Sequence, residues 1–236
     1  MEWIELGELI YKPISGEWGK EIVGDKDENS VKVLRTTNFT NEGLLDYSDV
    51  VLRNINTEKV EIKKLNYGDI IVEKSGGTDN FPVGRVVYFD KVKEIYLCNN
   101  FTTIFRTKRE GIKNKYLFYF LFYNYNKGGM IKYYNKTTGI QNLKVNFFIK
   151  DLKVPVPPME TQEKIVQILD QAQALIDKRK EQIQALDQLI DSIFYTMFGD
   201  PVSNEKGWEV KELGELSSLV TKGSSPNWQG IEYCSL

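Results

Sequence analysis

Residues 154–201 read VPVPPMETQEKIVQILDQAQALIDKRKEQIQALDQLIDSIFYTMFGDP, and this stretch decides the architecture of the chain. It opens on a stiff joint, because each proline fixes φ and lacks a backbone N–H. Residues 159–198 then contain neither glycine nor proline, while Gly199 and Pro201 stand where a helix commonly ends. The pattern predicts one helix of 40 residues, which at about 1.5 Å per residue is about 60 Å long.

Apolar residues recur along this helix in steps of four and three, which is the spacing of a coiled-coil seam. A helix this long cannot bury its seam against its own small domain. We therefore expect an antiparallel partner helix, from a later part of a longer chain or from a second copy; packing along its own domain is the alternative. The predicted pairing residues are Ile165, Leu169, Ala172, Ile176, Ile183, Leu186, Ile190, Ile193 and Met197, with Arg179 as a polar interruption.

Upstream of the joint, residues 1–157 show the pattern of one mixed domain. Runs of β-branched and aromatic residues alternate with turn signals, and a dense Leu, Phe and Tyr run at 115–125 predicts a buried helix. The expected fold class is α+β, with a globular mixed α/β domain at 1–157 followed by a long coiled-coil-forming helix at 158–199. The predicted strands are 31–35, 47–52, 69–73, 84–89, 95–98, 102–106 and 151–155.

The net charge of −2 conceals a segregation of charge along the chain. Residues 101–158 carry 11 Lys and Arg against 2 Asp and Glu, a net of +9, whereas residues 159–200 carry 4 against 8, a net of −4. A concentrated basic segment favours a polyanionic partner such as nucleic acid. A solvated lysine-rich surface would have the same composition.

The end of the chain repeats its beginning. Glu5-Leu6-Gly7-Glu8-Leu9 recurs as Glu212-Leu213-Gly214-Glu215-Leu216, 207 residues later, and tryptophans flank both copies at positions 3, 18, 208 and 228. Self-similarity of this kind is the sequence sign of a repeated structural unit. We therefore expect residues 200–236 to be the start of a second, truncated repeat.

Four short motifs precede or enter the long helix in order: WIELGEL at 3–9, GDII at 68–71 with SG at 75–76, TGIQNL at 138–143 and VPVPPMETQ at 154–162. Together with the helix they resemble the specificity (S, HsdS-like) subunit of type I restriction-modification systems. Those subunits have two tandem units, each a target recognition domain followed by a long helix, and the two helices pair antiparallel. The resemblance covers nearly the whole chain, but only one complete unit is present. It therefore implies a half-subunit or a truncated form of a longer subunit.

The resemblance implies a non-catalytic role in which the domain recognises one half of a bipartite sequence in double-stranded DNA. It also implies docking of methyltransferase (M) subunits and assembly with the restriction (R) subunit. With the seam at 159–198 we expect an antiparallel homodimer that recognises an inverted repeat. Two alternatives stay open: a fragment of a two-domain subunit, and a coiled-coil interaction protein that binds no nucleic acid.

Composition removes several other classes of function. The chain has no histidine, which excludes imidazole bases and His-containing zinc sites, and its two cysteines form no CxxC pair. We expect no metal and no cofactor, and the acidic residues at 25, 27 and 28 read as a solvated loop. The chain shows neither a signal-peptide pattern nor an apolar run of about 18 residues, so we expect a cytoplasmic protein without membrane contact.

Three polar segments are the candidates for DNA contact, because lysine neutralises phosphates while Thr, Asn and Gln bond to the backbone or to base edges. Arg35 could bond a guanine twice. One segment lies at 35–38, one at 74–80 between two predicted strands, and one at 132–139 within the basic region, with Gln141 shortly after it. The predicted contact residues are Arg35, Thr36, Asn38, Lys74, Ser75, Gly76, Thr78, Asn80, Lys132, Tyr133, Lys136, Thr137 and Gln141.

Overall fold

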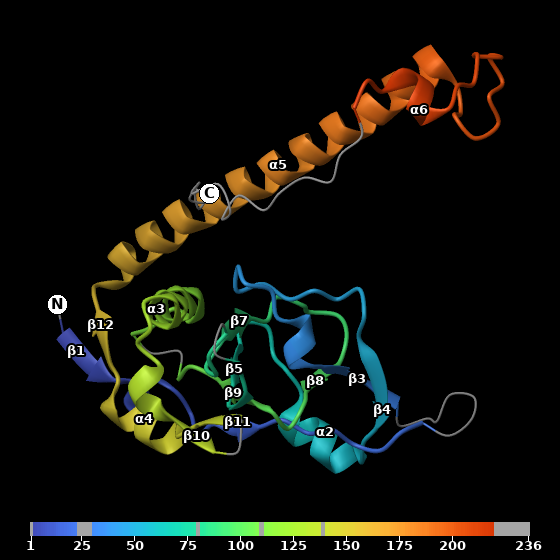
Figure 1. The fold of residues 1–236 in the computed structure, drawn as a ribbon. Helices are drawn as coiled ribbons and strands as arrows, with labels where there is room; N and C mark the ends of the chain where they lie inside the picture. Colours follow the sequence, from blue (N-terminus) through green and yellow to red (C-terminus); the bar gives the residue numbers. More distant parts are fainter. Residues whose placement is uncertain (1, 23–29, 79–80, 109–110, 138–139, 220–236) are drawn as a thin grey trace. The chain divides into compact units, whose positions relative to one another are not determined.

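The computed structural model describes residues 2–22, 30–78, 81–108, 111–137 and 140–219. The chain divides into two compact units, Met1–Ala174 and Leu175–Leu236. The first unit therefore includes the first sixteen residues of the long helix, which the sequence prediction placed with the rest of the helix. Figure 1 shows the elements of each unit in sequence colours.

A four-stranded antiparallel sheet forms the centre of the first unit. Its order is β2 (Ile14–Ser15), β9 (Thr102–Phe105), β5 (Ile70–Glu73) and β7 (Val86–Tyr88). Successive side chains of a strand point to opposite faces, and here both faces are buried. Ile70 and Val72 of β5 lie in one apolar cluster, while Ile71 lies in another with Ile104 and Val87. The apolar run Ile70–Val72 of β5 is uninterrupted because the sheet is covered on both sides.

A second sheet has the order β4 (Val51–Asn54), β3 (Ser30–Leu34) and β8 (Tyr96–Cys98). β3 pairs antiparallel with β4 and parallel with β8. The helix α2 (Thr57–Lys63) follows β4, and its Val60 packs against Val33 and Leu97 of the sheet. The side chain of Asn56 caps α2 by accepting a hydrogen bond from the Glu58 N–H, as an N-cap residue does.

The start of the chain pairs with the strand that leads into the long helix. β1 (Glu2–Glu5) lies antiparallel to β12 (Lys153–Val156), and the two strands are side by side in Figure 1. The single turn α1 (Leu6–Leu9) packs on α4 (Val145–Asp151), and the helix α3 (Asn114–Asn126) packs on β7. Their apolar side chains form the largest cluster of the unit together with Ile70, Phe105 and Phe148.

Another small sheet, of three strands, has the order β10 (Tyr134–Thr137), β11 (Ile140–Leu143) and β6 (Ser75–Gly76). The 3₁₀ turn η2 (Ile131–Tyr133) leads into β10, and another, η1 (Thr36–Asn38), follows β3. β6, β10 and η1 lie within segments predicted to contact DNA, and β11 contains the further predicted contact residue Gln141.

The long helix α5 spans Met159–Phe198, the range predicted from the sequence. Gly199 follows with a φ of +77°, the left-handed conformation that ends many helices. The Lys206 ammonium donates hydrogen bonds to the Thr196 and Met197 carbonyls, and the Trp208 indole donates to the Phe198 carbonyl. These side chains satisfy carbonyls that the end of a helix leaves without intrahelical partners.

The repeated pentapeptide takes the same form twice. α1 and α6 (Leu213–Leu216) are both single turns preceded by extended backbone, with φ of −62° and −68° at the preceding glutamate. Leu6 and Leu9 are 0% and 6% exposed, whereas Leu213 and Leu216 are 72% and 67% exposed. The copies therefore share a local conformation and differ in what covers them.

The predicted α+β class with a long helix is confirmed. Six predicted strands match β3, β5, β7, β8, β9 and β12 within two residues at each end, and the predicted helix at 115–125 is α3. The prediction was wrong at 47–52, where only β4 from Val51 is strand, and at 151–152, because α4 ends at Asp151 and β12 begins at Lys153. Among the described residues, no helix is long and apolar enough to cross a membrane.

Candidate nucleic-acid interface

Two of the three predicted segments are joined by the small sheet. Gly76 pairs with Gln141 and Ser75 with Asn142, and β11 pairs in turn with β10. The Ser75 hydroxyl donates to the Asn142 side-chain oxygen at 2.8 Å. Backbone bonds extend the connection, because the Leu143 N–H donates to the Lys74 carbonyl at 2.8 Å. Residues far apart in the sequence therefore form one polar edge, which we call the β6–β11 edge and define as residues 74–78, 134–137 and 140–143.

The side chains of β11 alternate between the interior and the solvent. Gln141 and Leu143 are buried, whereas Ile140 and Asn142 are exposed. Gln141 accepts a hydrogen bond from the Val83 N–H at 2.9 Å and donates to the Thr78 carbonyl at 3.3 Å. Its side chain therefore joins Val83 to Thr78 inside the domain, and the DNA contact predicted for Gln141 stays a prediction. The outward neighbour Asn142 was missed, although the alternation of a strand could have identified it.

The remaining predicted segment, residues 35–38, is linked to the β6–β11 edge by a buried ion pair. Arg85 donates to both oxygens of Glu73, at 2.9 and 3.2 Å, and to the Thr36 carbonyl in η1 at 3.1 Å. Burial alone would lower the pKa of Arg85, but the hydrogen bond and charge of Glu73 outweigh it and raise the pKa above its ordinary value. Because Glu73 directly precedes Lys74, this pair fixes η1 relative to the second segment.

Within η1 the side chains serve the loop itself. Asn38 is 3% exposed, accepts from the Arg35 N–H and donates to the carbonyls of Asp46 and Asp49. The Asn38 amide is therefore bonded within the domain, and the DNA contact predicted for this residue stays a prediction. Arg35 donates to the Asp49 carboxylate at 2.6 Å, so bonding a guanine would require it to leave that partner. The contacts predicted for Arg35 and Thr36 stay predictions.

Lys132 and Tyr133 differ sharply in exposure. Tyr133 is 1% exposed, its ring packs edge-on against Phe148 and its hydroxyl donates to Asp151. The Tyr133 side chain belongs to the core, and the DNA contact predicted for it stays a prediction. The Lys132 ammonium is exposed and lies 2.8 Å from the Asp151 carboxylate, and this hydrogen bond, followed by that of Tyr133, lowers the pKa of Asp151.

Lys74 is the cation of the β6–β11 edge whose side chain the structure describes. Its ammonium donates to the Ser15 hydroxyl, and none of the ion pairs found among the described residues includes it. Burial lowers the pKa of Lys74 from its ordinary value. Desolvation without a paired carboxylate makes a phosphate oxygen a favourable partner for this group.

The turn after Gly76 is shaped by backbone that only glycine adopts easily. Gly76 and Gly77 have φ of +119° and +67°, and a Cβ on Gly77 would lie 2.5 Å from the Val83 nitrogen. Thr78 closes the turn by donating from its N–H to the Phe81 carbonyl, while its hydroxyl accepts from the Phe81 N–H. Asn80 lies outside the described residues, as do the side chains of Lys136 and Thr137.

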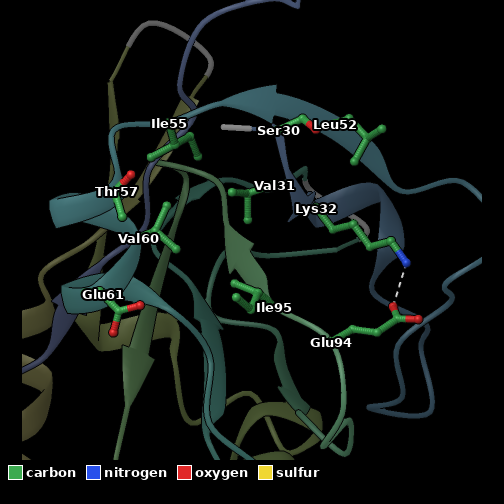
Figure 2. A pocket seen from close by; sticks show the side chains of 10 residues that line it. All are labelled: Ser30, Val31, Lys32, Leu52, Ile55, Thr57, Val60, Glu61, Glu94 and Ile95. Atoms are coloured by element: carbon green, nitrogen blue, oxygen red, sulfur yellow. Dashed lines mark hydrogen bonds and ion pairs between the residues drawn. The ribbon is translucent and has the colours of Figure 1, made fainter. Parts of the chain in front are cut away.

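A cavity of about 540 Å³ lies between β3, β4 and α2 and is lined by none of the predicted contact residues. Figure 2 shows apolar walls with a Lys32–Glu94 ion pair at one side. The hydrogen bond from Lys32 lowers the pKa of Glu94. The described residues contain no cluster of three acidic, Cys or His side chains that could hold a metal.

The predicted pairing residues of α5 differ in exposure along the helix. Ile165 is half-buried against the apolar cluster of the first unit. Leu169 is 38% exposed, and the seam residues from Ile176 to Met197 are between 48% and 65% exposed. Leu175, Leu189 and Phe194 widen this uncovered face. Packing along its own domain therefore covers the seam only at its start.

Residues 1–188 match the family described as type I restriction modification DNA specificity domain. The type I restriction enzyme MjaIX specificity subunit of Methanocaldococcus jannaschii is 28% identical over 133 residues, which cover 50% of this chain and 30% of that protein. The HsdS subunit of Thermoanaerobacter tengcongensis matches with 19% identity and a TM-score of 0.50, over 76% of this chain and 39% of that one.

The type I restriction-modification S subunit of M. genitalium matches with a TM-score of 0.55 and 14% identity, over 88% of this chain and 49% of that one. At these identities the two crystal structures show a shared fold. The chain spans less than half the length of each of these relatives.

Proposed function

Because this chain belongs to the type I restriction modification DNA specificity domain family, we propose that it recognises one half of a bipartite sequence in double-stranded DNA and performs no catalysis itself. The observation that carries the proposal is the β6–β11 edge. It brings Lys74, Ser75, Thr78 and Asn142 together from two distant segments, and Arg85 ties η1 to it. A charged group, hydroxyls and an amide on one edge match the donors and acceptors that phosphates and base edges require.

Within this proposal each group has a separate task. Lys74 and Lys132 neutralise phosphates, and Lys136 and Thr137 of β10 are further candidates for contacts with the DNA backbone. Ser75, Thr78 and Asn142 are the candidates for base edges, because their side chains carry both donors and acceptors. Gly76 allows the close approach of backbone to DNA. Gln141, Asn38 and Tyr133 support these loops from within the domain.

We further propose that methyltransferase subunits supply the chemistry and that the assembled complex also recruits a restriction subunit in the cytoplasm. The uncovered seam of α5 favours pairing with the same helix of a second copy, antiparallel, through residues 159–198. A helix of 40 residues is about 60 Å long, which corresponds to roughly one and a half to two turns of duplex. Two half-sites in inverted orientation with unread base pairs between them follow from that geometry.

The first test measures DNA binding of the chain with its methyltransferase partner. A half-site is selected from a randomised duplex pool, and affinity is then measured by fluorescence anisotropy over a range of salt concentrations. Lys74→Gln should weaken binding about equally for all sequences and reduce the slope of log K against log salt by about 0.9. Lys93→Gln, an exposed lysine outside the predicted segments, is the matched control and should leave the slope unchanged. Absence of binding to any sequence would overturn the proposal.

The second test addresses the oligomer by light scattering. The dimer predicts twice the 27.3 kDa of the chain, and Leu186→Glu should return the mass to that of one chain because it places a charge in the seam. Gln184→Glu adds the same charge beside the seam and should leave the dimer intact. A monomeric wild-type chain would favour the second candidate function, a fragment whose helix pairs within a longer subunit.

A further inference from the structure

β10 and β11 turn alternate side chains to the interior and to the solvent, and their register shows which ones share a face. Tyr134 lies opposite Leu143, and both pack in the apolar cluster of the first unit. The next pair, Asn135 and Asn142, is exposed on both strands. Directly opposite residues of an antiparallel pair point to the same side. Asn135 and Asn142 therefore lie together on the outward face.

Ile140 lies on the same outward face, because it is two residues from Asn142 along β11. Its side chain is 53% exposed, whereas Leu143 of the same strand is 7% exposed. Ile140 belongs to none of the apolar clusters formed by the described residues. Packing within the domain therefore does not explain an isoleucine at this position, and the outward face combines two amides with one apolar group.

The two amides keep hydrogen-bonding groups that the domain does not use. The Ser75 hydroxyl donates to the Asn142 side-chain oxygen at 2.8 Å, and that oxygen retains a second lone pair. Within the part of the chain that the structure describes, no hydrogen bond uses the Asn135 amide or the side-chain N–H groups of Asn142. Both amides can therefore donate to and accept from a ligand.

An amide beside an apolar group matches what an A·T base pair presents in the major groove. Adenine presents the N7 acceptor and the N6 donor, which one asparagine bonds together, and thymine presents a methyl group that takes an apolar contact. A G·C pair has no such methyl group. The major groove admits a two-stranded β-ribbon, and β10 and β11 form one, with only the two residues of β6 beside it.

The spacing of the outward side chains suits neighbouring base pairs. Ile140 and Asn142 are two residues apart, which is about 6.8 Å along a strand. Asn135 and Ile140 are diagonal neighbours, about 7–8 Å apart. Base pairs follow each other at about 3.4 Å, so these side chains reach positions about two steps apart in one half-site.

We propose that the outward face of β10 and β11 reads A·T base pairs of the half-site in the major groove. Asn135 bonds N6 and N7 of an adenine, and Ile140 contacts the methyl group of a thymine. The inference rests on the proposed function and deepens it, since it names two further specificity-determining residues and the bases that they recognise.

The test removes single groups from the DNA. In the selected half-site each adenine in turn is replaced by 7-deazaadenine, which lacks the N7 acceptor, and each thymine by uracil, which lacks the methyl group. Affinity is measured by fluorescence anisotropy with the methyltransferase partner present. We expect an adenine position at which wild type loses about fivefold in affinity and Asn135→Ala loses nothing. We expect a thymine position at which wild type loses about fourfold and Ile140→Ala loses nothing.

Asn126→Ala and Ile62→Ala are the matched controls, because both side chains are exposed and lie outside the β6–β11 edge. They should respond to each modified base as wild type does. A base that the methyltransferase contacts weakens binding equally in every variant, so it does not imitate the expected pattern. Asn135→Asp should shift the preference at the adenine position toward cytosine, because a carboxylate accepts from the cytosine N4 group. All of these variants should keep the wild-type urea midpoint of unfolding.

The outcomes separate this inference from the proposed function. If Asn135→Ala lost as much affinity as wild type at every 7-deazaadenine, the role of Asn135 would be overturned. Equal losses of Ile140→Ala and wild type at every uracil would overturn the role of Ile140. In both cases selective binding by wild type would leave the proposed function standing. A wild-type complex that selects no sequence would reject the proposed function and the inference together.

Discussion

Gln162→Met removes the hydrogen bonds that join the first turn of α5 to the loop before α3 and to Pro157. The size and shape of the side chain are nearly unchanged. Methionine has nearly the length and volume of glutamine and a similar helix propensity, so the apolar packing around the position is retained. The change leaves the Lys113 N–H and the carbonyls of Gly111 and Pro157 without their protein partner. Its effect therefore reports on the polar contacts of one side chain.

The magnitude follows from the surroundings of the three partners. Pro157 is buried and Lys113 is half-buried, whereas Gly111 is exposed and its carbonyl can turn to water. A buried polar group that loses its partner costs about 1–3 kcal/mol. We expect the free energy of unfolding to fall by about 2–4 kcal/mol, since two groups carry most of the loss. For a domain of this size that corresponds to a decrease in Tm of about 4–16 °C.

The assay is urea and thermal unfolding, followed by circular dichroism in the near-ultraviolet region so that tertiary packing is observed. Gln184→Met is the matched control, because Gln184 lies on the exposed part of the same helix. It should leave Tm and the urea midpoint at their wild-type values. If Gln162→Met unfolded at the same temperature as the control, the three bonds would contribute nothing and the reasoning from burial would be refuted.

Three further predictions concern the recognition domain. Gly77→Ala should lower the free energy of unfolding and weaken DNA binding, because the new Cβ would lie 2.5 Å from the Val83 nitrogen. Gly111→Ala meets no atom within 4 Å and should lower the free energy of unfolding only through the strain of its positive φ. The two variants are compared by the urea midpoint of unfolding and by the fluorescence anisotropy of bound DNA. Arg85→Met should lower stability by about 3–5 kcal/mol, because it leaves the buried carboxylate of Glu73 without its partner, and a double variant with Glu73→Leu should recover much of the loss in the same urea assay. Burial raises the pKa of Cys98 to about 11, so this thiol should react with an aromatic disulfide reagent at pH 8 only after unfolding. Its contribution to stability is full below pH 9.0, the ordinary value, and is lost as the pH rises through about 11.

Most elements of the fold could be predicted because their signals are local. The helix from Met159 to Phe198 follows from forty residues without Gly or Pro, ended by a glycine whose φ is positive. Strands such as β5 and β9 follow from short apolar runs between turns. The pairing of β1 with β12 could not be found this way, because Trp3 and Pro155 become partners only when the chain closes on itself.

The local sequence does not indicate which polar residues of the candidate interface face outward. Gln141 and Asn142 are adjacent, similar in chemistry and opposite in exposure, and their orientation depends on the register with Ser75 and Gly76. The side-chain nitrogen of Asn38 is bonded internally, because the carbonyls of Asp46 and Asp49 lie next to η1 and accept its hydrogen bonds. The polar composition of the loops therefore predicts where the candidate interface lies. Which side chains face outward is known only once the pairing of the strands is known.

The charge pattern along the chain is explained more by folding than by DNA. Lys113 and Lys115 from the basic segment pair with carboxylates of the acidic helix, and Arg106 and Lys132 pair with carboxylates inside the domain. The exposed pairs among these are weak singly and screened by salt, yet all four pairs lower the positive charge available to phosphates. The opposite net charges of the +9 and −4 segments favour the contact between the start of α3, which carries Lys113 and Lys115, and the start of α5, which carries Glu163 and Asp170. Electrostatic attraction to DNA then depends on cations such as Lys74, which stands outside the basic segment and has no carboxylate within the described ion pairs to neutralise it.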